Sequence, residues 1–146
     1  MPHKPVSFLI VDDDVVSIMS MKRTITKLRL LNPVKEARDG IEALEILRNT
    51  NQPEGLQSPF IVILDLNMPR MSGHELMKEV RSDPALRDTV IFVMSTSDSP
   101  VDVQNAYAAN AAGYILKDGS PNSFREALTL LGAYSEVVVL PEISAA

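Results

Sequence analysis

Short apolar runs alternate along the chain with longer segments in which apolar residues recur every three or four positions. The runs are rich in β-branched residues and bounded by turn residues, as is typical of strands, whereas the longer segments have the period of amphipathic helices. The five predicted strands lie at 7–11, 33–37, 60–64, 90–94 and 113–116. Because strands and helices alternate, the pattern predicts an α/β fold with a parallel sheet.

Capping residues mark where the predicted helices begin. Asp14, Asp39 and Ser72 precede three of them, and the pairs Ser99-Pro100 and Ser120-Pro121 precede the other two. The expected ends are residue 30 for the first helix and about 81, 110 and 134 for the last three. Residues 60–64 show no alternation, which indicates a central strand buried on both faces.

The last twelve residues follow the final predicted helix. Their segment 136–140 has high β-propensity and is expected to add a strand or to cover an apolar patch. The sequence is therefore divided into one domain over 1–134 and a C-terminal tail over 135–146.

Composition narrows the possible chemistry. The 146 residues are the length of one domain, and they contain no Cys and only two His, which excludes thiol chemistry and a multi-histidine metal site. The net charge of -5 and the lack of a basic stripe argue against nucleic acid as a partner. The apolar runs are too short for a membrane span or a signal peptide, so no membrane partner and a cytoplasmic location are expected.

Polar residues follow four of the predicted strands. Asp12 and Asp13 follow the first strand, Asp65 the third, Ser95 the fourth and Lys117 the fifth. In an open α/β sheet the ligand site lies beyond these carboxyl ends. Adjacent carboxylates repel one another, which is relieved by a divalent cation or a raised pKa, and oxygen ligands favour Mg²⁺.

The same set of side chains suits phosphoryl chemistry. A metal ion, the Ser95 hydroxyl and the Lys117 ammonium group are donors for the three terminal oxygens of a phosphoryl group. Because the sequence has no Gly-rich phosphate loop, a nucleotide is not the obvious carrier. The candidate carrier is a carboxylate nucleophile that forms an acyl phosphate.

Four segments carry a resemblance to a known family. They are VDDD from Val11, LDLNMPRMSG from Leu64, MS from Met94 and GYILK from Gly113. Over residues 5–134 the sequence resembles the receiver domain of two-component response regulators. This resemblance implies a flavodoxin-like, CheY-like fold: a doubly wound, five-stranded parallel sheet of order 2-1-3-4-5 with five helices.

The resemblance also implies roles at the acidic end of the sheet. Asp65 would be phosphorylated by a histidine kinase or a histidine phosphotransfer protein. Asp13, Asp65 and the backbone carbonyl of Asn67 would ligate Mg²⁺, and Asp12 would act through a bound water.

Three further residues gain roles from the resemblance. Ser95 and Lys117 would hold the phosphoryl oxygens, and Tyr114 matches the switch aromatic whose rotation follows Ser95. The protein would thus be a phosphorylation-switched binding module with self-phosphorylation and autodephosphorylation only, and no outside substrate. The sequence is similar to stand-alone receivers associated with phytochrome-type or hybrid kinases.

The sequence departs from the family pattern in two places. Asp118 replaces the usual Pro after Lys117, so we expect a trans bond there and an altered path at 118–120, because a non-proline cis bond costs about 2.5–4 kcal/mol. Ser95 replaces the more frequent Thr. Asn67 and Ser97, which flank the path of an attacking water in this family, offer no acid or base to activate it, so we expect slow to moderate dephosphorylation.

Output is expected to leave through a protein surface, because too few residues follow the last predicted helix for a helix-turn-helix module. By resemblance this surface comprises the fourth helix, fifth strand and fifth helix. Its expected residues are Ala106, Tyr107, Ala108, Ala109, Phe124 and Leu128. We expect an unidentified downstream protein, or a second copy of the chain, to bind there.

Two other functions fit parts of the sequence. The run from Asp12 to Val16 matches the D-x-D-x-V pattern of haloacid-dehalogenase-type phosphatases, with Asp12 as nucleophile and Asp14 as acid/base. That reading leaves Asp65 and the residues after it unexplained. A degenerate receiver that acts only as a scaffold is the third possibility.

Overall fold

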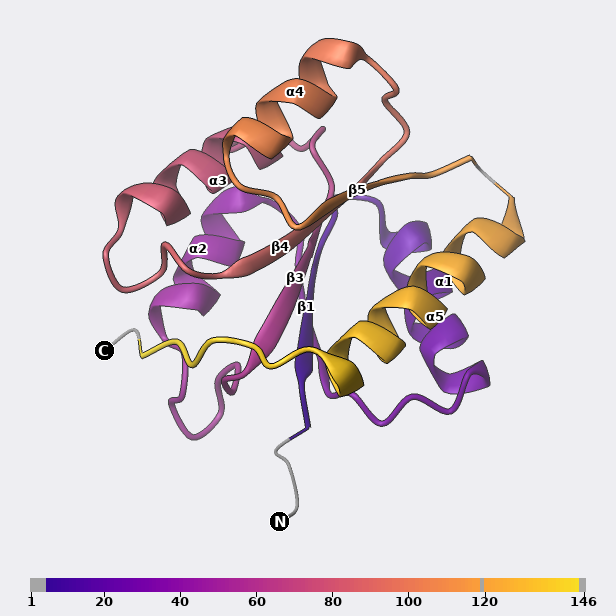
Figure 1. The fold of residues 1–146 in the computed structure, drawn as a ribbon, viewed down its shortest axis with the longest axis horizontal. Helices are drawn as coiled ribbons and strands as arrows, with labels where there is room; N and C mark the ends of the chain where they lie inside the picture. Colours follow the sequence, from indigo (N-terminus) through magenta and orange to yellow (C-terminus); the bar gives the residue numbers. More distant parts are fainter. Residues whose placement is uncertain (1–4, 119, 145–146) are drawn as a thin grey trace.

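The computed structural model of the protein describes residues 5–118 and 120–144. Its core is a five-stranded sheet, all parallel, in the order β2-β1-β3-β4-β5, which confirms the predicted topology (Figure 1). The strands are β1 (Ser7–Val11), β2 (Val34–Ala37), β3 (Phe60–Leu64), β4 (Val90–Ser95) and β5 (Gly113–Leu116). Every residue of β1 and β3 is buried, as expected for the centre of a doubly wound sheet.

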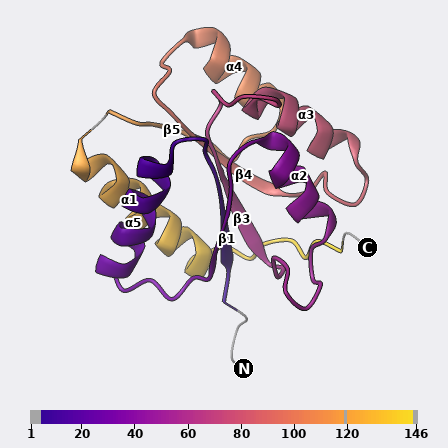
Figure 2. The ribbon, with the colours of Figure 1, turned by 180° about the vertical axis from the view of Figure 1, so that it is seen from behind.

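Five helices cover the two faces of the sheet. On one face lie α1 (Val15–Lys27) and α5 (Pro121–Val137). On the other lie α2 (Gly40–Arg48), α3 (Gly73–Ser82) and α4 (Pro100–Ala108), and the view from behind shows the same two layers (Figure 2). Each layer has its own apolar core. No helix in the described part of the chain is long and apolar enough to span a bilayer.

The helix starts follow the predicted caps, with one physical difference. Asp14, Asp39 and Ser72 each accept a backbone N–H at the start of a helix. Ser99 and Ser120 also precede helices, but their side chains make no capping hydrogen bond.

Two helix ends differ from the prediction. Helix α1 stops at Lys27 because Arg29 adopts a left-handed backbone (φ 57°), and the N–H of Leu30 then donates to the carbonyl of Ile25. Helix α4 ends close to the expected residue 110, where Asn110 also has a left-handed backbone (φ 64°). Helix α5 continues past the expected end at residue 134, so the first residues of the predicted tail are helical.

The described part of the tail, up to residue 144, covers the base of the sheet and forms no strand. Leu140 packs into the α1/α5 core and Ile143 into the α2/α3/α4 core, and the chain between them crosses below the sheet (Figure 1). Ile143 is also held by its backbone: its N–H donates to Ser58 Oγ at 2.8 Å, and its carbonyl accepts from Asn51 Nδ2 at 3.0 Å. Of the two outcomes expected for 136–140, the added strand is wrong, and the cover is confirmed for Leu140 but not for Val137 and Val139, which are exposed.

Candidate functional site

The predicted carboxylates meet at the carboxyl end of the sheet. Val11 of β1 pairs with Leu64 of β3, so the next residues, Asp12 and Asp65, emerge side by side. A backbone hydrogen bond of 2.9 Å from the Asp65 N–H to the Val11 carbonyl continues this alignment. Oxygen atoms of Asp12, Asp13 and Asp65 all lie within 4.8 Å of one another. An all-oxygen group of this kind fits Mg²⁺.

Lys117 reaches this group from the end of β5. Its ammonium nitrogen lies 2.7 Å from Asp12 Oδ2 and 4.0 Å from Asp65 Oδ1. The Asp12 side chain is almost fully buried, and its other oxygen accepts the N–H of Asp14 at 2.9 Å. Lys117 therefore neutralises the most buried carboxylate of the group.

Asp65 has an unusual proton affinity. Burial raises the pKa of its carboxyl to about 6, and the neighbouring charges of Asp12 and Asp13 act in the same direction. Lys117 and the backbone N–H of Asn67 oppose this rise in pKa. A crowded, partly desolvated carboxylate favours a cation or a covalent partner that removes its charge.

Asp14 stands outside the site. Its carboxylate caps α1, accepting the N–H of Val16 and the hydroxyl of Ser17, each at 3.0 Å. These bonds, the Ser17 hydroxyl first, lower the pKa of Asp14. A carboxylate committed to a cap is poorly suited to the acid/base role that the phosphatase alternative requires.

Ser95 and Tyr114 share one loop partner. The Ser95 side chain is fully buried at the end of β4, and its Oγ accepts the N–H of Ser97 at 3.1 Å. The Tyr114 hydroxyl donates to the Ser97 carbonyl at 2.7 Å. The N–H of Lys117 donates to the Ser95 carbonyl at 2.7 Å, which joins the fourth and fifth strand ends.

The loop after Asp65 is held by contacts that sequence analysis did not identify. Arg70 has a left-handed backbone (φ 63°), and its Nε donates to Asp39, the cap of α2, at 2.8 Å. Gly73 closes the loop through an N–H bond to the Leu66 carbonyl, and a Cβ there would lie 2.5 Å from the Asp65 carbonyl oxygen. The only signal in the sequence was the glycine itself.

The peptide bond after Lys117 matches the expectation from Asp118. Within residues 5–118 and 120–144 the only cis bond precedes Pro59, so Lys117 and Asp118 are joined in trans. The expected altered path over 118–120 includes Gly119, which lies outside the described residues.

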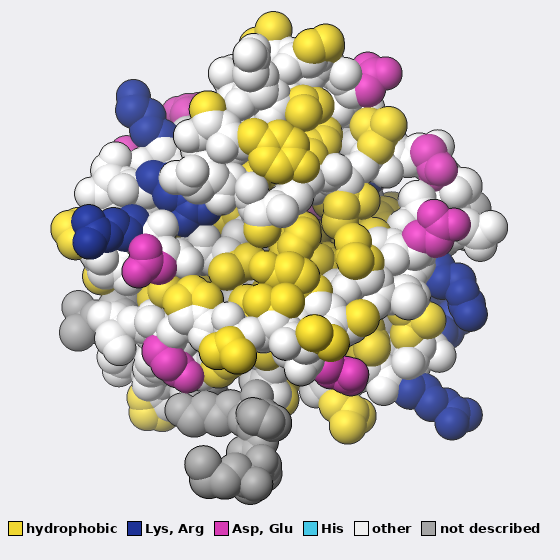
Figure 3. All heavy atoms as spheres, viewed as in Figure 1, with side chains coloured by type: hydrophobic (Ala, Val, Ile, Leu, Met, Phe, Trp, Pro, Cys, Tyr) yellow, Lys and Arg dark blue, Asp and Glu magenta, His cyan; other side chains and the backbone are white. Residues whose placement is uncertain are grey.

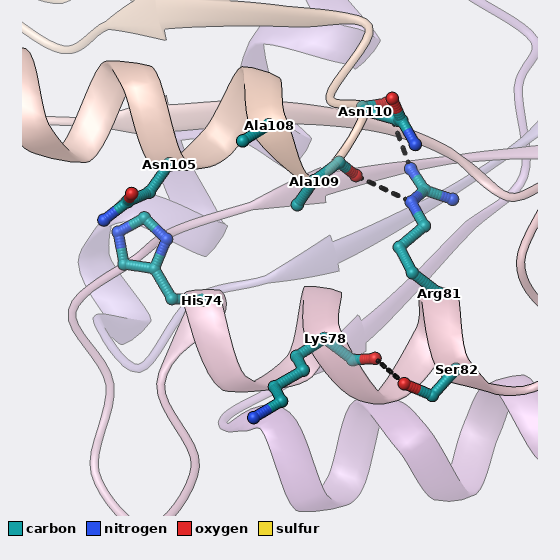
Figure 4. Close-up of a pocket in the computed structure, with 8 residues that line it drawn as sticks. All are labelled: His74, Lys78, Arg81, Ser82, Asn105, Ala108, Ala109 and Asn110. Atoms are coloured by element: carbon teal, nitrogen blue, oxygen red, sulfur yellow. Dashed lines mark hydrogen bonds between the residues drawn. The ribbon is translucent and has the colours of Figure 1, made fainter.

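A second cluster of polar side chains, which sequence analysis also did not identify, lies between α3 and α4. Here a groove of about 430 Å³ is lined by residues that include His74, Lys78, Arg81 and Asn105 (Figure 4). His74 Nε2 lies 3.1 Å from Asp102 Oδ1, across the helix pair. Such a contact depends on the packing of two helices distant in sequence, so no local pattern reveals it.

Residues 8–129 match the family described as the response regulator receiver domain. The chain belongs to this family. It is 31% identical over 122 residues to a probable methanogenesis regulatory protein, FilR2, of Methanothrix harundinacea, covering 84% of this chain and 76% of that protein. It is 32% identical over 120 residues to a chemotaxis protein CheY homologue of Campylobacter jejuni, covering 82% of this chain and 87% of that protein.

Solved structures show the same fold. The phosphorylated cyanobacterial phytochrome response regulator RcpA aligns with a TM-score of 0.84 at 25% identity, over 94% of this chain and 99% of that one. The Mn²⁺-bound form of the response regulator Rcp1 aligns with a TM-score of 0.79 at 26% identity, over 94% and 99% of the two chains. The resemblance to phytochrome-associated receivers is thus confirmed.

Family membership fixes the general role of the receiver. Response regulator receivers act in two-component signalling as phosphoacceptor switches rather than classical enzymes, and they bind Mg²⁺ in an acidic pocket. Asp12, Asp13 and Asp65 form an acidic group whose oxygen atoms are close enough together to fit such an ion.

Proposed function

We propose that the protein is a single-domain response regulator that accepts a phosphoryl group on Asp65 from a phosphohistidine. The donor belongs to a histidine kinase or a histidine phosphotransfer protein. A carboxylate oxygen of Asp65 attacks phosphorus, the O–P bond forms as the P–N bond breaks, and the donor imidazole leaves with the electron pair and takes a proton. The observation that carries this proposal is the crowding of Asp65 by two carboxylates and Lys117 at one end of the sheet.

Four residues are proposed to hold Mg²⁺. Asp13, Asp65 and the backbone carbonyl of Asn67 are direct ligands, and Asp12 acts through a bound water. When bound, the ion offsets the negative charge of the carboxylates and of the incoming phosphoryl group. The mutual proximity of the three carboxylates supports this assignment.

Ser95 and Lys117 are proposed to hold two of the phosphoryl oxygens. In this proposal the Ser95 side chain turns its O–H toward the phosphoryl group, and the Lys117 ammonium group, now bound to Asp12, reaches toward Asp65. Tyr114, bound to the same loop, would follow Ser95. Asn67 and Ser97 carry no group that activates water, so loss of the acyl phosphate is proposed to be slow to moderate.

The phosphodonor is proposed to contact the exposed start of α1. Val15, Val16 and Met19 project large apolar side chains into solvent within two turns of Asp13. Exposed apolar side chains grouped beside a reactive group are typical of a protein contact. The donor would thereby place its phosphohistidine against the acidic pocket.

Output is proposed to use the face formed by α4, β5 and α5. Figure 3 shows hydrophobic side chains gathered over β5 between the two helices. Exposed large apolar residues on these elements include Tyr107, Leu116 and Leu130. Two residues expected in this surface, Ala106 and Leu128, are fully buried core residues instead, because they lie on the sheet-facing sides of their helices.

The face is proposed to bind a downstream protein or a second copy of the chain. Residues 135–146 remain proposed as a tail to the receiver domain, 1–134. Light scattering of the full chain, with and without the phosphoryl analogue beryllofluoride, tests the homodimer. An unchanged monomer mass at high concentration would contradict self-association through this face.

The central proposal is tested with acetyl phosphate and Mg²⁺. We expect one phosphoryl group to be added and to map to Asp65, and the Asp65→Asn variant to remain unmodified. Modification at Asp12 would instead support the phosphatase alternative. A chain that is modified nowhere, yet remains folded, would indicate a scaffold.

A further inference from the structure

Helix α1 and the residues after it form a basic segment in an otherwise acidic chain. Residues 15–35 hold five Lys or Arg and no Asp or Glu, whereas the rest of the chain holds nine Lys or Arg against nineteen Asp or Glu. The net charge of -5 therefore hides one segment of strongly positive charge. A surface of one sign attracts partners of the opposite sign.

The outward side of α1 has an apolar part and a basic part. The buried residues of the helix, which face the sheet, are Ile18, Met21 and Ile25. With 3.6 residues per turn, Val16, Arg23 and Lys27 fall on the opposite side, and all three are exposed. Met19 lies beside Val16 and is 53% exposed. The start of the helix thus presents apolar side chains, and the basic side chains follow along the same ridge.

Contacts within the protein do not account for this basic ridge. In residues 5–118 and 120–144, no carboxylate oxygen lies within 4.0 Å of the Arg23 or Lys27 side chain, whereas Lys22 pairs with Glu36 at 3.1 Å. The helix dipole favours a cation in the last turn of α1, where Lys27 lies. Arg23 lies before that turn, so the dipole gives no reason for its charge.

The ridge begins beside the acidic group of the proposed site. Helix α1 starts two residues after Asp13 and runs from the carboxyl end of β1 back along one face of the sheet (Figure 2). A helix rises about 1.5 Å per residue, so Arg23 and Lys27 lie about 10 and 16 Å beyond Val16. One protein surface seated on the start of α1 can therefore reach both cations.

We infer that the phosphodonor carries an acidic surface beside its phosphohistidine, and that this surface pairs with Arg23 and Lys27. The inference rests on the proposed function, which places the donor on the start of α1. Apolar side chains of the donor then cover Val16 and Met19, and its carboxylates follow along the ridge. Opposite charges speed the encounter of two proteins and select between partners. Nucleic acid suits the ridge less well, because the neighbouring carboxylates of the site repel its phosphates.

The test measures the binding of Ala-based helical peptides to the full chain by its amide NMR signals at low salt. Each peptide carries two Leu at the spacing of Val16 and Met19, and two Glu at the spacing of Arg23 and Lys27. Peptides of both chain orders are used, because α1 does not fix the direction of its partner. We expect the better Glu peptide to bind α1 at least about threefold more tightly than a counterpart with Gln for each Glu. This preference should vanish in about 1 M NaCl, where the screening length is about 3 Å.

Two double variants locate the preference on the surface. Arg23→Gln with Lys27→Gln removes both cations and should abolish the preference for Glu. Arg48→Gln with Lys78→Gln changes the net charge equally at exposed positions of α2 and α3, so it should keep the preference. Loss of the preference in both double variants would show that overall charge selects the peptide, and would overturn the inference. Tighter binding of α1 to a short DNA duplex than to the Glu peptide would also overturn it.

Phosphorylation by acetyl phosphate with Mg²⁺ separates this inference from the proposed function. Such a small donor needs no contact with α1, so both double variants should be modified at Asp65 at the rate of the unaltered protein. A chain that is modified at Asp65 but shows no preference for the Glu peptide would overturn the inference alone. A chain that binds the Glu peptide but is not modified would lack the proposed function, and the inference would fail with it.

Discussion

Lys117 donates a hydrogen bond to Asp12 and none to Asp65. Its ammonium nitrogen lies 2.7 Å from the first carboxylate and 4.0 Å from the second, which is beyond hydrogen-bond distance. The buried carboxylate is thereby neutralised, while the proposed nucleophile is influenced by Lys117 only through space. This division explains why Asp65 retains a pKa of about 6 despite a nearby cation.

Removing the charge of Lys117 should therefore raise the pKa of Asp65 further. In Lys117→Met the cation that lowers this pKa is lost, while burial, Asp12 and Asp13 still raise it. Titration of the Asp65 side-chain carboxyl carbon by NMR, without divalent ions, measures the value directly. We expect a midpoint above 6 in the variant. Lys22→Met, which breaks a surface pair with Glu36, is the control and should leave the Asp65 midpoint unchanged.

Stability should depend on pH through Asp65. Its folded pKa of about 6 exceeds the ordinary 3.8, so the folded chain binds more protons between these values and becomes less stable as pH rises through them. The Asp65→Asn variant has no titrating carboxyl at this position, so it lacks this fall in stability with rising pH. Without divalent ions, the variant should gain stability over the unaltered protein from pH 4 to 6, reaching about 1–3 kcal/mol above pH 7.

Urea unfolding at several pH values measures this difference. Glu45→Gln, an exposed change on α2, provides the baseline. A stability gain in Asp65→Asn that is the same at pH 4 and pH 7 would show that Asp65 is not the titrating group.

Local signals in the sequence were enough for most of the fold. The wholly apolar run of β3 predicted a buried central strand, and Asp14, Asp39 and Ser72 predicted helix starts because a cap acts on its own first turn. The end of α1 was missed, because the left-handed backbone falls on Arg29, a residue type that seldom adopts it and so leaves no clear mark in sequence.

The candidate site was predictable for a topological reason. Parallel strands bring their carboxyl ends together, so Asp12, Asp65 and Lys117 meet once the strand order is known. The link from Asp102 to His74 could not be predicted in this way. It depends on how α3 and α4 pack, which no spacing along the chain encodes.

Mg²⁺ should stabilise the chain through Asp13 but not through its neighbour Asp14. A ligand that binds only the folded state adds about 1.4 kcal/mol when its concentration is about ten times Kd. Asp13→Asn removes one carboxylate of the group and should lose most of this gain. Asp14→Asn should keep it, since Asn caps a helix about as well as Asp. Thermal unfolding with MgCl₂ and with EDTA measures the gain, and equal losses in both variants would contradict the assignment.

Two glycines should respond differently to Ala. At Gly73 a Cβ would lie 2.5 Å from the Asp65 carbonyl oxygen and 2.7 Å from Leu66 Cα, both backbone atoms that cannot move alone. We expect Gly73→Ala to cost about 1–3 kcal/mol and to slow phosphorylation, since it displaces the loop after Asp65. At Gly132 the Cβ would meet the flexible end of the Leu30 side chain. The higher helix propensity of Ala, worth about 1 kcal/mol, offsets the cost of this close contact.

Chemical denaturation and the rate of phosphorylation by acetyl phosphate separate the two glycines. Gly132→Ala should stay near the unaltered protein in both measurements. If Gly73→Ala lost stability but kept the full rate, the position of the loop would not control phosphoryl acceptance.

In the tail, Ile143 should contribute to the stability of the fold, whereas Val139 should not. Ile143 is 3% exposed and closes the base of the α2/α3/α4 core, whereas Val139 is 96% exposed. Ile143→Ala should therefore cost about 2–4 kcal/mol, and Val139→Ala less than about 0.5 kcal/mol. Urea midpoints of the two variants measure these costs. Equal midpoints would mean that the tail does not stay on the base in solution, and its apolar residues would then be available to a partner.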